Sequence, residues 1–514
     1  MTRHNGARPL FCWSFFLIFS ICSIVSMTSV RSARSDYTVM VDPSDDRGTW
    51  EGWGGSLAWW GNGIGSSSYQ DTYADLLFTL KPVRFFGVTL PGLGLNIARY
   101  NIGGGGLPSD NIGGTVDRRP SIMPWYKDID GYWIDWYDSN PASASWDFYR
   151  DSNQRNMMWA ARDRGATFEF FANAPMWWMT TAKSSAGGAL QAWNRRDFAR
   201  YLASVVAYAH SHWGVRVSSL EPFNEPSAGW WSYPKDQEGC NLTGSVQKEI
   251  LGALREELDA RGLHSVTLAA SDENTMTQAQ ATYSYFSTQR VSVNGKSTAV
   301  TSLIGKVNVH AYNGLDPWRD NAARQSLRRA VGSKRLWMSE YGDGEGSGMT
   351  LARTITEDLN HLRPTAWVYW QPVEPYSAWG LVNGAYGSAS DEASPTRGQP
   401  LWVYTKYYVL AQFSRFLRPG YQVVGSSDGN TVVAYSRADS RLVLISVNYG
   451  SPQTIRYDLS RLSSVPDSTV QVTVTQTDGS RLLSESTVPL RGKTLTVAVE
   501  KNSIQSLVVS GVTL

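Results

Sequence analysis

Cysteine is scarce in this sequence. The 514 residues include three cysteines, and two of them, Cys12 and Cys22, lie in an apolar stretch near the N-terminus. Cys240 is the one that remains, which excludes an internal disulfide and a metal site built from several cysteines. Histidine is also scarce, since six residues are scattered along the chain and none belongs to an HExxH motif. The sequence therefore does not support a metal-dependent hydrolase.

The chain also lacks a strong charge of either sign. Its formal net charge is +2, and the first 34 residues contribute four arginines and no acidic residue, so the remainder carries −2. No basic run or stripe follows in the rest of the sequence. This argues against a nucleic-acid partner.

A single long hydrophobic run lies near the N-terminus, at residues 9–27, after Arg3 and Arg8. A basic start, an apolar run and small polar residues after it are typical of a secretory signal, which we place at residues 1–34. A membrane anchor is the alternative, but serines interrupt the run and polar sequence follows at once. We expect an extracellular protein without membrane attachment, and Asn241, in an Asn-Leu-Thr tripeptide, is a candidate glycosylation acceptor.

Aromatic residues, by contrast, are abundant, with 22 Trp and 25 Tyr. Most of them are expected to fill the core. Trp and Tyr also offer flat apolar faces with one polar group, which suit the C–H faces of sugar rings.

Eight apolar, strand-like segments alternate with helical stretches between residues 50 and 415. This count predicts a (β/α)8 barrel. A doubly wound sheet is the alternative, but its phosphate-binding glycine pattern is missing, because no helix start follows the glycines at 103–106 closely. The eight segments are 51–60, 94–106, 166–179, 218–226, 266–274, 306–314, 335–344 and 365–373.

The pattern changes after a last helix expected at residues 400–416. Residues 416–514 contain short segments of period two with Gly, Asp and Ser turns, which predict an appended antiparallel β-sandwich domain. Residues 35–49 alternate in the same way and are expected to add a strand to that sandwich.

Acidic residues at the ends of the predicted barrel strands are the catalytic candidates, because barrel active sites form at that face. Glu225 ends the fourth strand and Glu340 the seventh. Hydrolysis of a glycosidic bond with retention needs two carboxyl groups about 5–5.5 Å apart, and two facing strands can supply them. Asp272 and Glu273 are the competing pair, but adjacent strand residues point to opposite faces.

Neighbouring residues refine this assignment. His310 and Tyr312 on the sixth strand are expected to hydrogen-bond to Glu340, and Arg99 to help keep it ionised. Asn224 offers an amide to a sugar hydroxyl. Glu221 lies one layer below the rim and is expected to be structural, with an arginine as its partner.

Several motifs resemble glycoside hydrolase family 30, and within it the fungal endo-β-1,6-galactanases. They are FNEPSAGWW around Glu225, WMSEYGDGEG around Glu340, GWGGSLAWWG, ARYNIGGG and KYYVLAQFSRFLRPGY. The resemblance implies a barrel with a β-sandwich, and a retaining mechanism without a cofactor. It implies Glu225 as general acid/base and Glu340 as nucleophile.

The resemblance also implies a substrate and its contacts. The substrate would be β-1,6-galactan, as in arabinogalactan side chains, cleaved by a monomeric enzyme. The residues implied in substrate binding are Arg99, Asn224, His310, Tyr312, Trp60, Trp178 and Trp370. Relatives that act on β-1,6-glucan, glucuronoxylan or glucosylceramide leave alternatives open; Arg319 is the nearest basic candidate for binding a uronate. A non-catalytic carbohydrate-binding protein is the alternative of another class, and it would not need both glutamates.

Overall fold

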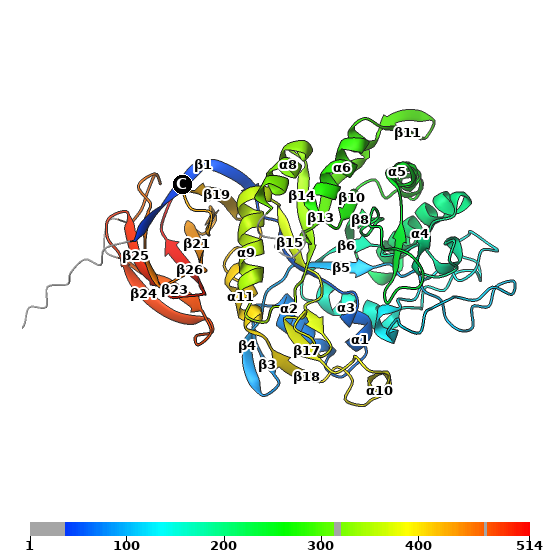
Figure 1. The fold of residues 1–514 in the computed structure, drawn as a ribbon, viewed down its shortest axis with the longest axis horizontal. Helices are drawn as coiled ribbons and strands as arrows, with labels where there is room; N and C mark the ends of the chain where they lie inside the picture. Colours follow the sequence, from blue (N-terminus) through cyan, green and yellow to red (C-terminus); the bar gives the residue numbers. More distant parts are fainter. Residues whose placement is uncertain (1–35, 313–319, 467–469) are drawn as a thin grey trace, which may run out of the picture. The chain divides into compact units, whose positions relative to one another are not determined.

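A closed barrel and a nine-stranded sheet make up the part of the chain that the computed structural model describes (Figure 1). The described residues are 36–312, 320–466 and 470–514. The expected signal segment and Arg319 lie outside them. Residues 35–514 form one compact unit.

The eight strands of the barrel correspond to the eight predicted segments, in the predicted order around the ring. Each pairs in parallel with its neighbours, and β15 closes the ring on β2, with Trp367 opposite Trp53. The (β/α)8 prediction is therefore confirmed. The strands are β2 (Gly52–Ser56), β5 (Ile97–Asn101), β6 (Thr167–Phe171), β8 (Val217–Glu221), β10 (Thr267–Glu273), β13 (Ile304–His310), β14 (Arg335–Tyr341) and β15 (Ala366–Tyr369).

Amphipathic helices follow the strands and cover the barrel. In α4 (Arg195–Tyr208) the buried residues include Phe198, Leu202 and Val206, spaced four apart along one face. The others that cover the barrel are α1 (Trp60–Ile64), α2 (Gln70–Phe78), α3 (Ser152–Arg162), α5 (Gly244–Ala260), α6 (Met276–Ser287), α8 (Asn321–Val331), α9 (Met349–Glu357) and α11 (Thr405–Ser414).

The last helix is shorter than expected. Residues 400–416 were predicted to be helical throughout, but α11 begins at Thr405. Pro400–Val403 instead forms β18, which pairs with β17 (Val382–Gly384). The apolar residues of this segment fit a helix or a strand, and Pro400 favours the start of a strand over a helix interior.

The nine-stranded sheet folds over on itself around β1 (Tyr37–Thr49). This strand pairs antiparallel with β19 (Gln422–Ser426) and parallel with β22 (Gln453–Asp458). Apolar residues from both sides of β1 share one core, which includes Val39 and Leu444. The remaining strands are β20 (Thr431–Ser436), β21 (Arg441–Asn448), β23 (Val470–Thr477), β24 (Ser484–Leu490), β25 (Thr494–Val499) and β26 (Ser503–Ser510).

The outer face of this sandwich packs on the barrel. Along β21, Leu444 belongs to the sandwich core, whereas Val443 and Ile445 belong to the core that includes the barrel. Because side chains alternate between the two faces of a strand, β21 contributes residues to both cores. Gln412 of α11 is fully buried at this contact, where its side chain accepts a hydrogen bond from Ser506 Oγ at 2.7 Å.

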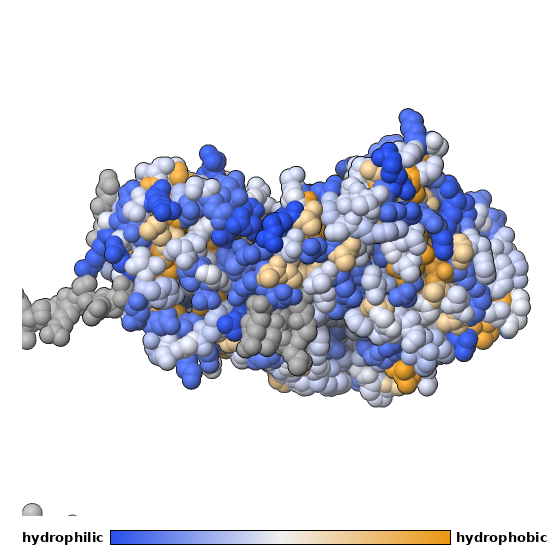
Figure 2. Space-filling model, turned by 45° about the horizontal axis from the view of Figure 1, so that its top comes forward, coloured by the Kyte–Doolittle hydropathy of each residue, from blue (hydrophilic) through white to orange (hydrophobic). Residues whose placement is uncertain are grey.

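The face of the molecule shown in Figure 2 is mainly polar. Figure 2 shows hydrophilic residues over most of one face, with small, scattered hydrophobic patches. Among the described residues, no helix is long and apolar enough to span a membrane.

Candidate active site

Two glutamates, one in β14 and one in the loop after β8, lie close together. Glu340 lies within β14, whereas β8 ends at Glu221 and Glu225 follows four residues later, in a loop. Glu225 has a positive φ of 47°, and its backbone N–H donates to the carbonyl of Asp272 at 2.9 Å. Its own carbonyl accepts a hydrogen bond from Trp231 Nε1 at 2.9 Å. These contacts hold a strained residue in place, a feature that clusters at functional sites.

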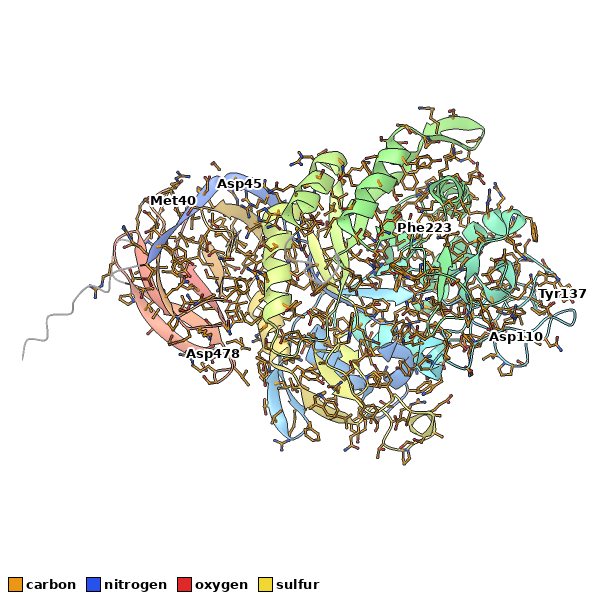
Figure 3. The ribbon with its side chains drawn as sticks, viewed as in Figure 1. Met40, Asp45, Asp110, Tyr137, Phe223 and Asp478 are labelled. Carbon is orange, nitrogen blue, oxygen red and sulfur yellow. The ribbon has the colours of Figure 1, made fainter. Side chains whose placement is uncertain are left out.

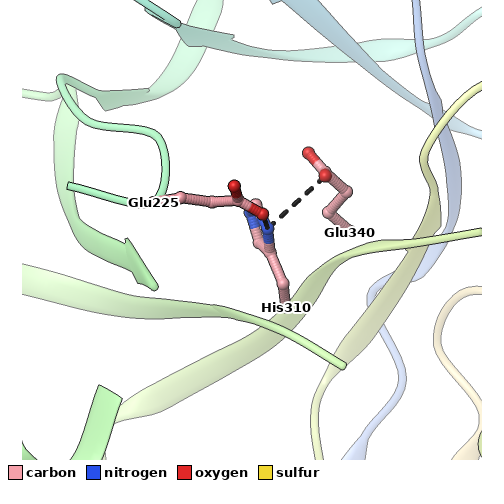
Figure 4. A group of neighbouring side chains, drawn as sticks. All are labelled: Glu225, His310 and Glu340. Atoms are coloured by element: carbon pink, nitrogen blue, oxygen red, sulfur yellow. Dashed lines mark hydrogen bonds and ion pairs between the residues drawn. The ribbon is translucent and has the colours of Figure 1, made fainter. Parts of the chain in front are cut away.

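His310 lies between the two carboxylates (Figure 4). Its Nδ1 lies 3.2 Å from Glu225 Oε1 and 3.4 Å from Glu340 Oε1. One oxygen of each glutamate and a ring nitrogen of His310 all lie within 4.8 Å of one another. Two carboxyl groups this close can act on the same glycosidic bond.

The compact Glu–His–Glu group has the residue types of a metal site. His310 also faces a third carboxylate, because its Nε2 lies 3.2 Å from Asp272 Oδ1. Burial alone lowers the pKa of His310, but the charges of Glu340 and Asp272 outweigh it and raise that pKa well above the usual value. These charges favour the protonated ring, which pairs with the carboxylates around it.

A buried ion network supports the site from inside the barrel. Arg99 is fully buried, and it contacts Asp272 at 2.6 Å and Glu169 at 2.9 Å. Its Nη1 lies 3.6 Å from Glu340 Oε2. Below it, Lys306 forms a short ion pair with Glu169. Arg99 thus places a fixed positive charge beneath Glu340.

Opposing influences act on the ionisation of Glu340. Burial raises the pKa of Glu340 to about 8, and the charge of Glu225 adds to this, while His310 and Arg99 act in the opposite direction. Asp272 behaves differently: burial opposes its ionisation, but Arg99 and His310 overcome this and lower its pKa far below the usual value.

An open pocket of about 290 Å³ exposes the pair to solvent. Trp59 and Trp370 line it in an edge-to-face pair with ring centroids 5.1 Å apart. Trp230 and Trp379, each 43% exposed, stand at its margin. The other lining residues are Asn224, Glu225, Gln237, Asn274, Tyr312 and Glu340. Aromatic faces with a few polar groups are typical of a sugar site.

The two glutamates have different polar contacts in the pocket. Asn274 Nδ2 donates to Glu225 Oε1 at 2.6 Å. Tyr312 lies beside Glu340, and burial together with the charge of Glu340 raises the pKa of its hydroxyl well above the usual value. Among the described residues, neither Glu340 Oε2 nor Asn224 Oδ1 has a hydrogen-bond partner, although both are buried. These two oxygens remain available to a ligand.

The structure brings most of the expected site residues together. Asn224, Tyr312 and Trp370 line the pocket with the glutamates, while Arg99 and His310 lie beneath them. Asn274 and Gln237 were not anticipated. Asn274 directly follows the Asp272–Glu273 pair at the end of β10, so the strand-end rule could have found it.

Two of the expected tryptophan platforms lie elsewhere. Trp60 is fully buried and its Nε1 donates to the carbonyl of Ser56, so Trp59 is the member of this pair that lines the pocket. Trp178 is 3% exposed and lines a different pocket. The physical reason is that both pairs follow the end of a strand, where the alternation of side chains that would assign one member to the barrel interior no longer applies.

The competing acids prove to have structural contacts. Asp272 points into the barrel toward Arg99, whereas Glu273 accepts hydrogen bonds from Ser227 and Thr282. Glu221 lies inside the barrel, but it forms no ion pair with an arginine among the described residues. Burial, followed by the charges of Asp272 and Glu169, raises the pKa of Glu221 well above the usual value. Its surroundings therefore favour the neutral form of Glu221.

Asn241 lies in β9 (Gly239–Asn241) and not in a free loop. It is half-buried, and its Nδ2 donates to the carbonyl of Ala228 at 3.1 Å. Glycosylation at this nitrogen would have to displace that contact. The glycan stays a prediction.

Comparison with known proteins agrees with the fold and the pocket. A family model described as O-Glycosyl hydrolase family 30 matches residues 36–382. An endo-beta-1,6-galactanase of Hypocrea rufa is 38% identical over 490 residues, covering 94% of this chain and 96% of that protein. An exo-beta-1,6-galactobiohydrolase of Bifidobacterium longum is 24% identical, covering 90% of this chain and 39% of that protein.

Solved structures share the architecture. A conserved exported protein from Bacteroides fragilis has a TM-score of 0.73 at 20% identity, covering 92% of this chain and 100% of that one. The catalytic domain of GH30 xylanase C from Talaromyces cellulolyticus has a TM-score of 0.66 at 20% identity, with the same coverage. At this identity the likeness shows the fold alone. The family match over more than half of the chain and the 38% identity to the Hypocrea rufa protein show that the chain belongs to O-glycosyl hydrolase family 30 and is an O-glycoside hydrolase.

Proposed function

We propose that this protein is a secreted endo-β-1,6-galactanase that cleaves its substrate with retention of configuration. The proximity of Glu225 and Glu340, within 4.8 Å, carries the retaining mechanism. The substrate and the internal mode of cleavage rest on the Hypocrea rufa relative, which shares 38% of its residues with this chain. Secretion rests on the basic and apolar pattern of residues 1–34.

The contacts of Glu340 support its role as the nucleophile. Arg99 lies 3.6 Å from Glu340 Oε2, and together with His310 it favours the ionised form of Glu340 against the effect of burial. Glu340 Oε2 has no hydrogen-bond partner among the described residues and can attack the anomeric carbon. Glu340 is accordingly the nucleophile and Glu225 the general acid/base.

The reaction then proceeds in two displacements. Glu225 gives its proton to the glycosidic oxygen as that bond breaks, and a Glu340 oxygen forms an ester with the anomeric carbon. Ionised Glu225 next takes a proton from a water molecule, which attacks the same carbon and releases Glu340. The imidazolium of His310 and the guanidinium of Arg99 stabilise the negative charge of Glu340 when it is ionised.

The substrate is tested with a panel of polysaccharides. Incubation with de-arabinosylated arabinogalactan, β-1,6-glucan and glucuronoxylan is expected to release short β-1,6-galacto-oligosaccharides from the first polymer alone. Glucose oligomers or xylo-oligosaccharides as the main products would refute the galactanase assignment. Proton NMR of the first product formed tests retention, because the β-anomer must appear before mutarotation.

The roles of the glutamates are tested by substitution. Glu340→Gln is expected to abolish turnover, and Glu225→Gln to regain part of its rate with azide or with a substrate that has a good leaving group. Glu249→Gln, at an exposed ion pair with Arg195, is the matched control and is expected to keep full activity. Wild-type activity in Glu340→Gln would overturn the nucleophile assignment.

A further inference from the structure

A second aromatic pocket lies outside the active site. Its volume is about 560 Å³, and no residue that lines it also lines the catalytic pocket. It is formed by the long segment after β5 and by the segment that joins β6 to α4. Figure 3 places Tyr137, one of its lining residues, at the edge of the barrel.

The back of this pocket is rigid. Trp133 stacks on Trp146 with an interplanar angle of 14°, and it meets Trp178 edge-to-face with ring centroids 5.1 Å apart. Trp178 Nε1 donates to the carbonyl of Trp133 at 2.8 Å. These rings are almost fully buried, so they form a fixed base. A fixed base costs little conformational entropy when a ligand binds.

The front of the pocket presents aromatic rings to solvent. Trp136 is 38% exposed, Tyr137 69% and Trp193 75%. Folding does not require Trp193 to be an aromatic residue, because three-quarters of its surface remains in water. Exposed aromatic residues grouped on a rigid base are typical of a binding surface.

Polar side chains stand among these rings. Lys183 reaches over the Trp136 ring at 6.0 Å, and Arg200 pairs with Asp197 at 2.7 Å. Gln191 and Asn194 add amides to the lining. Alternating aromatic faces and hydrogen-bonding groups match a sugar ring, whose apolar C–H face is bordered by hydroxyl groups. They match a lipid chain poorly, because a chain offers no partners to these polar groups.

The position of the pocket connects it to the substrate. The residues that line it follow the C-terminal ends of β5 and β6, and the catalytic glutamates stand at the C-terminal ends of β8 and β14. Both pockets therefore open on the face of the barrel where the strands end. A polysaccharide chain can extend along this face beyond the catalytic pocket, whereas a short oligosaccharide cannot.

We infer that the pocket between Trp136, Trp178 and Trp193 is a second carbohydrate-binding site, which holds pyranose residues of the polymeric substrate away from the point of cleavage. This inference rests on the proposed function for the identity of the polymer. It assigns the site to tethering and not to catalysis. Loss of the site should weaken binding of polymers and spare the cleavage of short substrates.

The test compares the double variant Trp136→Ala/Trp193→Ala with its parent. Retardation in native gels that contain de-arabinosylated arabinogalactan measures polymer binding, with all chains carrying Glu340→Gln so that the polymer stays intact. The apparent affinity of the double variant is expected to fall about tenfold, the loss typical of an important aromatic contact. In chains with Glu340 restored, the ratio of kcat/KM on the polymer to kcat/KM on β-1,6-galactotriose should fall by a similar factor.

Trp402→Ala is the matched control. Trp402 is 38% exposed, like Trp136, but it lies in β18 and lines neither pocket. Its substitution is expected to leave both the retardation and the kinetic ratio unchanged. Unchanged retardation of the double variant would overturn the inference, as would an equal loss of activity on the polymer and on galactotriose. Failure of the proposed function would show separately, as no hydrolysis of galactan by the unsubstituted chain.

Discussion

Replacing Asp272 with asparagine removes one buried charge and keeps the shape of the side chain. Asp272 is fully buried, and its carboxylate lies 2.6 Å from Arg99 and 3.2 Å from His310. At an effective dielectric constant of about 20, these contacts correspond to attractions of about 6 and 5 kcal/mol. Desolvation offsets much of this, and loss of one partner of a buried ion pair costs about 3–5 kcal/mol net.

This loss can be measured as a shift in melting temperature. About 480 residues at an unfolding entropy of about 2.1 cal/mol/K per residue give about 1 kcal/mol/K, so a loss of 4 kcal/mol lowers the Tm by about 4 °C. Differential scanning calorimetry at pH 7 is the assay. Asp163→Asn is the control, because that residue forms an exposed ion pair with Arg162, and its Tm should change by less than 1 °C.

The pH dependence supplies a second measurement. Because the folded-state pKa of Asp272 is depressed, its ionisation stabilises the protein above the unfolded pKa of about 3.9, and this stabilisation is lost as the pH falls toward the folded value. The difference between wild type and Asp272→Asn should be constant from pH 7 to pH 5. At pH 3 it should be about 1 kcal/mol smaller. A difference below about 1 kcal/mol at pH 7, or one that widens in acid, would refute the reasoning.

Three further outcomes are expected. Glu221→Gln should change the Tm by less than about 2 °C, since burial favours the neutral form of Glu221; a larger loss in calorimetry would show that its charge matters. Initial rates should rise with pH up to about 8, because burial raises the pKa of Glu340 and Glu340 must be ionised to attack, and a profile that falls from pH 6 to pH 8 would contradict this. Trp59→Ala should raise KM for the polymer, whereas Trp60→Ala should cost about 3–5 kcal/mol of stability and leave the KM of the folded enzyme unchanged; an equal rise of KM in both variants would count against the pocket assignment.

Strand periodicity explains why the barrel and its glutamates were predictable. Each barrel strand is a short apolar run followed by a helix, and the rule that active sites form at strand ends selects Glu225 and Glu340 from many acids. The rule uses position along the chain alone. It does not require knowledge of any contact.

Side-chain direction after a strand end was not predictable in the same way. Trp59 and Trp60 follow the end of β2 and enter α1, so neither a period of two nor one of 3.6 applies to both. The strand β24 shows that period-two alternation is also weak in parts of the sandwich. Ser484–Leu490 exposes four consecutive polar residues and has no clear alternation.

Charge clusters that assemble from distant segments also escape a linear search. The sequence has no basic run, yet Arg47, Arg328, Arg329 and Arg363 line one pocket of about 490 Å³. They come from the end of β1, from α8 and from the turn before β15. The fold therefore creates a local positive charge that composition does not reveal.

The position of β1 in the sheet determines how late in synthesis this strand can pair with β22. Tyr37 pairs with Ile455, and the whole barrel lies between them in sequence. During synthesis from the N-terminus, β1 must wait for more than 400 residues before its partner leaves the ribosome. The barrel can close in the meantime, but the apolar face of β1 stays uncovered until the last strands arrive. Truncation between β19 and β22 would therefore leave one edge of β1 unpaired and prone to aggregation, even though the barrel residues are all present.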